Sequence, residues 1–283
     1  MPRLTGRAGI AAIELVYGLA LAAIVGAAAM SVLVRHQRAA FAISASASAR
    51  SQLRQGIAAL SAELLAAGGG AADLLARSDT AVELLVTVGI ALSCADAASG
   101  TVLDVAPRAR DGLLPAATWL RFPTPGDTVL VFDPARDDWS GHRVAASAPA
   151  PCADSLLASR RFAVRLILEP PGLSAPLTGR TVVRVARRAR WSVYRAADRT
   201  WSLGEREETV GKWSATQPVA GPMVGVGAAR PSPFRFLDAR GAALDDLAPR
   251  DSVAAIAITL RARAAGAAVV DSVRAVIAIR PGP

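Results

Sequence analysis

The stretch that decides the fold runs from Gly9 to Arg38 and reads GIAAIELVYGLALAAIVGAAAMSVLVRHQR. From Ile10 to Val34 it holds one charged residue, Glu14, and no proline. A helix needs about 20 apolar residues to cross a bilayer, so this stretch is long enough to span a membrane. The stretch therefore predicts a transmembrane helix over 10–34 that carries a carboxylate near its start.

Residues 1–9, MPRLTGRAG, form a short basic segment of the kind that precedes a targeting sequence. The sequence allows two alternative cleavage sites. A signal peptidase could cut among the small residues at 26–31, which would discard the span together with its charge. Alternatively, a cut between Gly9 and Ile10 makes Glu14 the fifth residue of the mature chain, one helical turn from a free amine. A carboxylate in lipid is tolerable when a cation neutralises it, so the second site explains Glu14.

Residues 9–15, GIAAIEL, resemble the prepilin-type cleavage and methylation motif of the type IV pilin superfamily. That motif has a glycine before the cut, an apolar first residue, a glutamate at the fifth position and a leucine after it. Ile10 stands where the family usually has phenylalanine, and Ser31 stands where it often has a proline kink. The resemblance rests on the basic leader, Gly9, Glu14 and the apolar span taken together.

The resemblance implies a processing route and a set of partners. Prepilin peptidase would cut between Gly9 and Ile10, the new amino group of Ile10 would be N-methylated, and Glu14 would be an assembly contact with other pilin-like subunits. The protein would then be a single-pass inner-membrane protein with its head on the periplasmic, extracytoplasmic side. The arginines that flank the span do not favour this orientation, which therefore rests on the resemblance alone.

The helix is expected to continue beyond the membrane as an exported half over 35–68. Leu53, Ile57, Leu60 and Leu64 fall on one face of such a helix and predict the seam where a head packs on it. Three glycines at 68–70 predict its end, because glycine readily adopts the left-handed conformation of a helix cap. We therefore expect one continuous helix over 10–67.

Residues 69–283 are expected to form a β-rich head, because several segments alternate apolar and polar residues with period two. The fold class predicted is α+β, pilin-like: a long N-terminal helix and a mostly antiparallel sheet packed on its second half. Strands are expected at 81–92, 118–122, 128–132, 162–169, 181–195, 200–203, 234–238, 252–263 and 272–280, hairpin turns at 195–200 and 238–241, and long loops at 105–115, 145–152, 170–179 and 215–233.

Two segments of the exported part resemble a subgroup of the superfamily. QLRQGIAALSAELLAAGG at 52–69 is similar to the helix end of J-type minor pseudopilins and W-type minor pilins. The segment 234–263, with an aromatic strand, a glycine turn and a valine-isoleucine strand, is similar to their late hairpin.

The two cysteines, Cys94 and Cys152, are expected to form a disulfide bond, because cysteine pairs tend to oxidise outside the cytoplasm. A bond between them would close a long loop and stabilise the fold by about 4 kcal/mol in the chain-entropy view. Two unpaired buried thiols are the alternative.

No residue pattern indicates catalysis, a cofactor or a metal site, so we expect a protein that is not an enzyme. Asp133, Asp137 and Asp138 offer oxygens that calcium prefers, but their spacing suits a solvated turn better than a calcium loop.

The formal net charge of +9 raises the question of a nucleic-acid partner. All the basic residues but Lys212 are arginines, in an alanine-rich chain, and their one dense run is Arg184, Arg187, Arg188 and Arg190 within a strand-like segment. This pattern indicates a coding bias, and we expect no nucleic-acid binding.

Two functions remain open. The first is a non-enzymatic minor pilin-like or pseudopilin subunit of a type IV pilus or a type II secretion pseudopilus. The second is a single-span, membrane-anchored envelope domain, a binding module that never assembles. Glu14 separates them, because an anchor that stays alone has no need of a carboxylate in its span.

Overall fold

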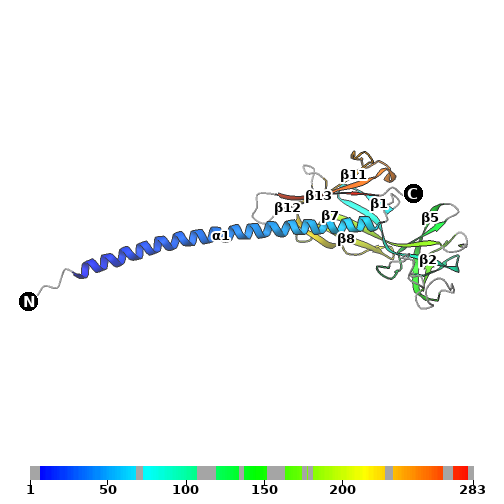
Figure 1. The fold of residues 1–283 in the computed structure, drawn as a ribbon, viewed down its shortest axis with the longest axis horizontal. Coiled ribbons are helices and arrows are strands. Elements are labelled where there is room, and N and C mark those ends of the chain that lie inside the picture. The colour runs from blue at the N-terminus through cyan, green and yellow to red at the C-terminus, as the bar shows by residue number, and fades with distance from the viewer. Residues whose placement is uncertain are drawn as a thin grey trace, which may run out of the picture.

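The computed structural model describes residues 7–67, 73–106, 119–133, 137–151, 163–173, 177, 181–226, 232–263 and 270–279, and only the backbone of residues 7–12, 95–99, 263 and 270. One long helix carries a head of two antiparallel sheets on its second half (Figure 1). The α+β class predicted from the sequence is confirmed at this level.

Helix α1 runs from Arg7 to Ala66 without a break, 60 residues in all. At 1.5 Å per residue it is about 90 Å long. At its end the Arg184 guanidinium donates a hydrogen bond to the carbonyl oxygen of Ala67 at 2.9 Å, which satisfies one of the acceptors that a helix end leaves unpaired. The helix agrees with the one expected over 10–67, and the glycines at 68–70 lie outside the described residues.

The strands of the larger sheet are β1 (Leu74–Arg77), β2 (Ala81–Ser99), β3 (Val102–Ala106), β4 (Thr128–Asp133), β5 (Asp138–Ala150), β6 (Ala163–Leu168), β7 (Val182–Arg195), β8 (Trp201–Thr209), the short β9 (Lys212–Trp213) and β10 (Gln217–Met223). The smaller sheet has the order β11 (Phe234–Leu237), β12 (Ala255–Arg263) and β13 (Val270–Ala278), and a short 3-10 turn, η2 (Arg250–Ser252), precedes β12.

The long strands β2 and β7 form a two-stranded ribbon that takes part both in the sheet beside the helix and in a barrel beyond it. They pair antiparallel from Ala81↔Ser192 to Leu92↔Val182. Near the helix the ribbon is flanked by β1 on one side and by β8 and β10 on the other. Farther along, β2, β3, β6, β5, β4 and β7 pair in sequence and β7 returns to β2, so these strands close into a small antiparallel barrel.

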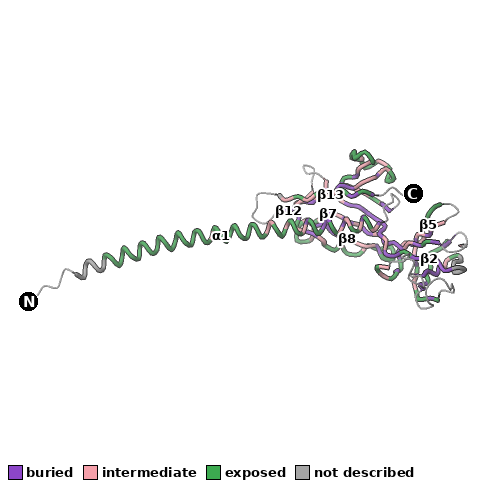
Figure 2. Tube along the Cα trace, in the orientation of Figure 1, coloured by how far each residue is buried: buried purple, intermediate pink, exposed green. Residues whose placement is uncertain are grey.

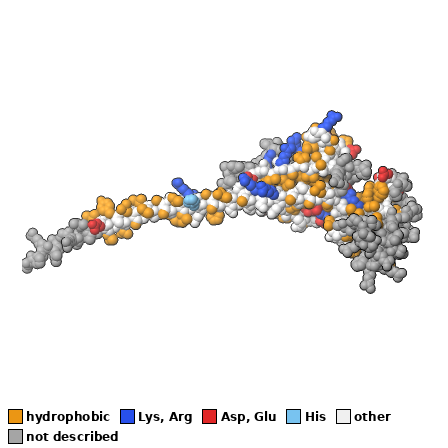
Figure 3. Space-filling view, viewed as in Figure 1, with side chains coloured by type: hydrophobic (Ala, Val, Ile, Leu, Met, Phe, Trp, Pro, Cys, Tyr) orange, Lys and Arg blue, Asp and Glu red, His pale blue; other side chains and the backbone are white. Residues whose placement is uncertain are grey.

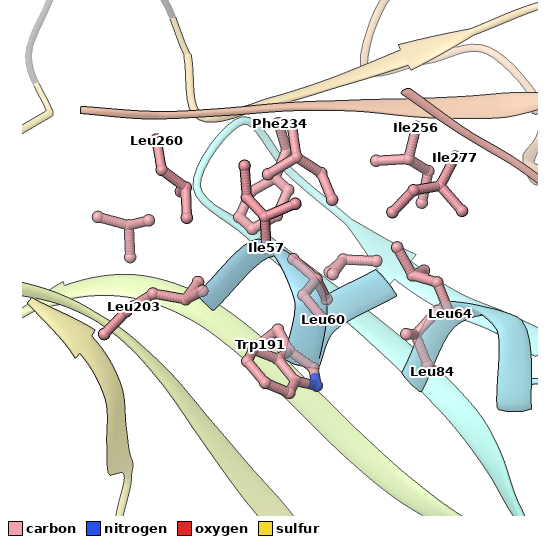
Figure 4. Packing of buried hydrophobic residues seen from close by; sticks show 14 of the residues in the cluster. Ile57, Leu60, Leu64, Leu84, Trp191, Leu203, Phe234, Ile256, Leu260 and Ile277 are labelled. Carbon is pink, nitrogen blue, oxygen red and sulfur yellow. The ribbon is translucent and has the colours of Figure 1, made fainter. Parts of the chain in front are cut away.

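The second half of α1 lies between the two sheets and supplies the centre of the first hydrophobic core. Leu53, Leu60 and Leu64 are buried there, with Trp191 and Leu203 on the larger sheet below and residues of β11 and β12 above (Figure 4). The leucine stripe predicted from its helical spacing is therefore the seam between helix and head. Because the helix is covered from two sides, truncating a leucine at its centre removes contacts with both sheets at once.

A second hydrophobic core fills the interior of the barrel. Its buried side chains come from every strand of the closed ring: Val88, Ala91, Leu103, Val105, Val129, Val131, Val144, Val164, Leu166, Leu168, Val183 and Val185. The barrel lies beyond the C-terminal end of α1, at the tip of the molecule that carries the β2 and β5 labels in Figure 1. The head thus has two cores that share the β2–β7 ribbon.

Several sequence expectations for the head were wrong or incomplete. Strand β10 occupies part of the predicted loop 215–233, and β5 enters the predicted loop 145–152. The segment expected as a strand over 118–122 makes one isolated bridge, Gly89↔Trp119, among its described residues. The turn at 238–241 is present, because the Asp238 N–H donates to the Ala242 carbonyl oxygen at 2.9 Å, but it leads to a bridge and not into β12.

Candidate membrane and assembly helix

The first half of α1 stands clear of the head. From residue 13 to residue 44 every residue but Val34 is exposed, and we call this segment the free half (Figure 2). Its side chains are almost all hydrophobic up to the basic residues at 35–38 (Figure 3). It belongs to α1, the one helix among the described residues that is long and apolar enough to cross a membrane, and an 18-residue window of that helix has a mean hydropathy of 2.1. A single pass through a membrane is therefore physically feasible, and an uncovered apolar helix is stable only with lipid or another protein around it.

Glu14 projects from this free half, where it is exposed. In the part of the chain that the structure describes, no hydrogen bond or ion pair involves its carboxylate. Gly9 and Ile10, the predicted cleavage and methylation residues, lie in the first turns of the helix, and the Ile10 side chain is outside the description. Both residues precede Glu14 on one continuous helix, so the i, i+4 relation of Ile10 and Glu14 predicted from sequence has the required backbone.

Two glycines follow Glu14 in the free half, Gly18 after four residues and Gly26 after a further eight. A Cβ atom added at Gly18 or at Gly26 would meet no other atom within 4 Å. Neither glycine is therefore required by packing inside this chain. Each costs helix stability, roughly 0.5–1 kcal/mol relative to alanine.

Ser31 occupies the position where the superfamily often has proline, and it leaves the helix intact. Its hydroxyl donates to the Ala28 carbonyl oxygen of the preceding turn at 2.8 Å, so its polar group is satisfied within the helix. The helix passes this point without a break.

The first polar contacts between α1 and the head lie about one turn beyond Phe41, which is itself exposed. Ser46 donates a hydrogen bond to Asp271 on β13 at 2.8 Å, and Arg50 forms an ion pair with the same carboxylate at 2.9 Å. These two hydrogen bonds hold the pKa of Asp271 below its ordinary value. Between the polar residues at 35–38 and Ser46, residues 39–44 of the helix are exposed, and no polar contact with the described part of the head is found there.

A charged cluster ties the far end of α1 to the larger sheet. Arg187 on β7 binds both carboxylate oxygens of Glu63 on α1, at 2.7 and 2.8 Å, and also pairs with Glu205 and Glu207 on β8. Burial raises the pKa of Glu63, with the two β8 glutamates adding to the rise and Arg187 opposing it. The one arginine thus faces three carboxylates in a mostly buried setting.

The neighbouring arginines of β7 are also matched by carboxylates. Arg184 binds both oxygens of Asp73 at 2.9 Å, and Arg188 pairs with Glu83 at 2.9 Å and with Glu208 at 2.7 Å. Cationic groups held in this way are poorly placed to bind phosphates, because each would first have to leave its carboxylate. Three arginines of the dense run, Arg184, Arg187 and Arg188, are therefore held by carboxylates of the head, whereas no such pair of Arg190 is found among the described residues.

The sequence predicted the apolar span and Glu14 but missed the role of Arg187. The alternation of β7 could have indicated this role. The covered face of the strand holds Val183, Val185, Ala189 and Trp191, and residue 187 falls on that same face. An arginine at a covered position needs an anion beside it, because a buried charge is costly unless it is paired. Glu63, beside the leucine stripe of the helix, is such an anion.

The remaining predicted residues that the structure describes lie in the barrel region. Cys94 is buried at 2% exposure and is disulfide-bonded. Cys152 lies outside the described residues, so its pairing with Cys94 stays a prediction.

The aspartates Asp133, Asp137 and Asp138 lie around the β4–β5 turn, where Asp137 has a positive φ of 52°. Within the described ranges no three histidine, cysteine or acidic side chains come together in a way that could hold a metal ion.

Comparisons with protein-family models, with curated proteins and with solved structures find no match to this chain.

Proposed function

We propose that this chain is a non-enzymatic minor pilin-like or pseudopilin subunit. In this proposal prepilin peptidase cuts between Gly9 and Ile10, and the mature protein assembles through α1 with other pilin-like subunits into a type IV pilus or a type II secretion pseudopilus. The chain would be a single-pass protein of the inner membrane, with its head on the extracytoplasmic side.

The observation that carries the proposal is the unused face of the free half of α1. Gly18 lies one turn beyond Glu14 on the same face of α1, whereas Gly26 lies two turns farther on and about 120° around the helix from Glu14. Both glycines open onto empty space in the isolated chain. Glycines let helices approach closely in lipid, where burying leucine against leucine gains little. Residues that cost helix stability and serve nothing inside the chain are explained if another helix packs on them.

Glu14 supports the same proposal through its charge. In lipid a carboxylate is tolerated when a cation lies against it, and along residues 13–34 the chain supplies none. The ammonium group created by a cut before Ile10 is a cation at the right depth, on the same chain or on a neighbour. A pairing between neighbours would fix the axial offset of one helix relative to the next.

The rival function, a stand-alone anchored envelope domain, shares the span and the head. It does not account for a carboxylate and two open glycines along the free half, because a lone anchor in lipid is better served by alanine or leucine at all three positions.

Mass spectrometry of the protein extracted from its native membrane tests the processing step. We expect a chain that starts at Ile10 and carries an N-methyl group. A chain that starts near Ser31 has lost the span and contradicts the proposal. Gly9→Val should block the cut, because a β-branched residue replaces the glycine at the cleavage site, whereas Gly6→Val in the same leader should leave processing unchanged.

A further inference from the structure

Within the apolar part of the free half, residues 13–34, Tyr17 is a second polar side chain, after Glu14, for which no polar partner is found among the described residues. Between Ile13 and Val34 the side chains able to form ordinary hydrogen bonds are those of Glu14, Tyr17 and Ser31. Ser31 is satisfied by its own helix. Tyr17 is 67% exposed, and no hydrogen bond of its hydroxyl is found in the described part of the chain.

Tyr17 and Glu14 are neighbours on the helix surface. They stand at i and i+3 of the unbroken helix α1, a spacing that places Cβ atoms about 5–6 Å apart. Long side chains in helices lean toward the N-terminus, so the ring of Tyr17 covers the turn that holds Glu14.

The chemistry of the two groups is complementary once water is absent. A hydroxyl placed in an apolar medium without a partner costs several kcal/mol, so the phenol requires an acceptor. A carboxylate has about four lone-pair sites, and an ammonium group from a neighbouring chain fills only some of them. A phenol that donates to a carboxylate forms a charge-assisted hydrogen bond, which is stronger than one between neutral groups.

We propose that Tyr17 is a positioning residue for Glu14. In the assembled state its phenol O–H donates to the Glu14 carboxylate of the same chain and holds that carboxylate toward the amino terminus of the neighbouring subunit. The neighbouring subunit is taken from the proposed function, on which this inference rests, whereas the hydrogen bond is a property of this chain.

A double-mutant cycle in the native membrane tests the proposal. The full chain carries a photo-crosslinking residue in place of Leu33, which is half exposed and lies well away from Glu14 along the helix. The measured quantity is the yield of crosslinks to a second pilin-like chain, identified by mass spectrometry. Tyr17→Phe, which removes only the hydroxyl, should lower the yield about threefold, the factor that corresponds to a typical interhelical hydrogen bond of about 0.6 kcal/mol.

Tyr17→Phe is then made in two variant chains, one that carries Glu14→Val and one that carries Gly26→Leu. In a Glu14→Val chain, Tyr17→Phe should cause no further loss. In a Gly26→Leu chain it should still cause the full threefold loss, because Gly26 is distant from Tyr17 and acts through close packing. An equal loss in the Glu14→Val background would mean that Tyr17 is an ordinary aromatic anchor at the membrane surface, and it would overturn the proposal.

Infrared spectroscopy separates the failure of this inference from that of the proposed function. The chain has two tyrosines, Tyr17 and Tyr194, so the difference between wild type and Tyr17→Phe isolates the C–O stretching band of Tyr17. In wild type the frequency of this band should be that of a phenol that donates a hydrogen bond, and in Glu14→Val the frequency should shift. An equal frequency in the two chains overturns the inference. If Glu14→Val leaves the crosslink yield unchanged, the assembly function fails, whatever the infrared band shows.

Discussion

Glu63 of α1 and Arg187 of β7 form a two-pronged ion pair, with Arg187 Nη2 at 2.7 and 2.8 Å from the two carboxylate oxygens. Arg187 lies on the covered face of β7 between Val185, which faces the barrel interior, and Ala189, which faces the helix. The pair therefore marks the boundary between the two hydrophobic cores and joins the end of the helix to the ribbon that both cores share.

Replacing this arginine should destabilise the head severely. Arg187→Met leaves Glu63, Glu205 and Glu207 facing one another without a cation. Removing one partner from a buried pair typically costs 3–5 kcal/mol, so we expect a loss of about 3 kcal/mol or more in the free energy of unfolding. Denaturant unfolding of the full chain in detergent, followed by tryptophan fluorescence, measures this loss.

Arg50→Gln is the matched control for Arg187→Met, because Arg50 is 59% exposed in its own ion pair and Asp271 keeps its hydrogen bond from Ser46. It should cost less than about 1 kcal/mol. Equal losses for the two variants would contradict the interior role of Arg187.

The raised pKa of Glu63 gives the head a specific pH dependence. A carboxyl group whose pKa is higher in the folded state than in the unfolded state favours folding while it is protonated, and this contribution is lost as the pH rises through the folded pKa. The free energy of unfolding should therefore carry a falling component that begins near the ordinary value of 4.5.

In Glu63→Gln that component should be absent, since glutamine does not titrate. The comparison is the difference between the two pH profiles, because other carboxyls with lowered pKa, such as Asp271, contribute in the opposite direction in both chains. Superimposable profiles for the two chains would show that burial of Glu63 has no thermodynamic effect.

Two leucines of the same helix should differ sharply in their contribution to folding. Leu60 is fully buried between the two sheets, whereas Leu65 is 70% exposed. Leu60→Ala should lower the free energy of unfolding by about 2–5 kcal/mol, because it leaves a cavity in contact with both sheets. Leu65→Ala should change it by less than about 0.5 kcal/mol, and the same denaturation experiment compares the two.

The sequence predicted the helix well because its signals are local. The apolar run, the charge near its start and the stripe at helical spacing are each recognised from residues a few turns apart at most. The strands β2 and β7 were also predictable, since their alternation follows from one covered face.

The barrel and strand β10 were not predictable from local pattern. Closure of the barrel depends on β7 returning to β2 across a long stretch of chain, and no local pattern specifies that pairing. Strand β10 contains Pro218 and Pro222, which read as loop residues, but the strand pairs with β8 at an edge of the sheet, where proline is tolerated. In the free half, the span and Glu14 were predictable from sequence. The empty space beside Gly18 and Gly26 could be seen only in the structure.

The two open glycines give a test that separates folding from assembly. Gly18→Leu and Gly26→Leu add side chains into empty space, so the isolated chain should keep its stability or gain slightly from better helix propensity. Crosslinking to neighbouring pilin-like subunits should fall at least tenfold for either variant, because the helices can no longer approach closely. Ile24→Leu is the control and should crosslink as wild type does, because Ile24 is exposed and lies about 160° around the helix from Gly26 and about 120° from Gly18.

The proposed assembly role of Glu14 is tested most directly by the crosslink yield of Glu14→Val in the native membrane, beside wild type. We expect this variant to insert and to be cut at Gly9 as wild type is, since neither step needs the carboxylate, while its crosslinks to partner subunits fall sharply. A Glu14→Val chain that is processed and crosslinks at the wild-type yield would contradict the proposed function, because the carboxylate would then be no assembly contact and the protein would act as a stand-alone anchored domain.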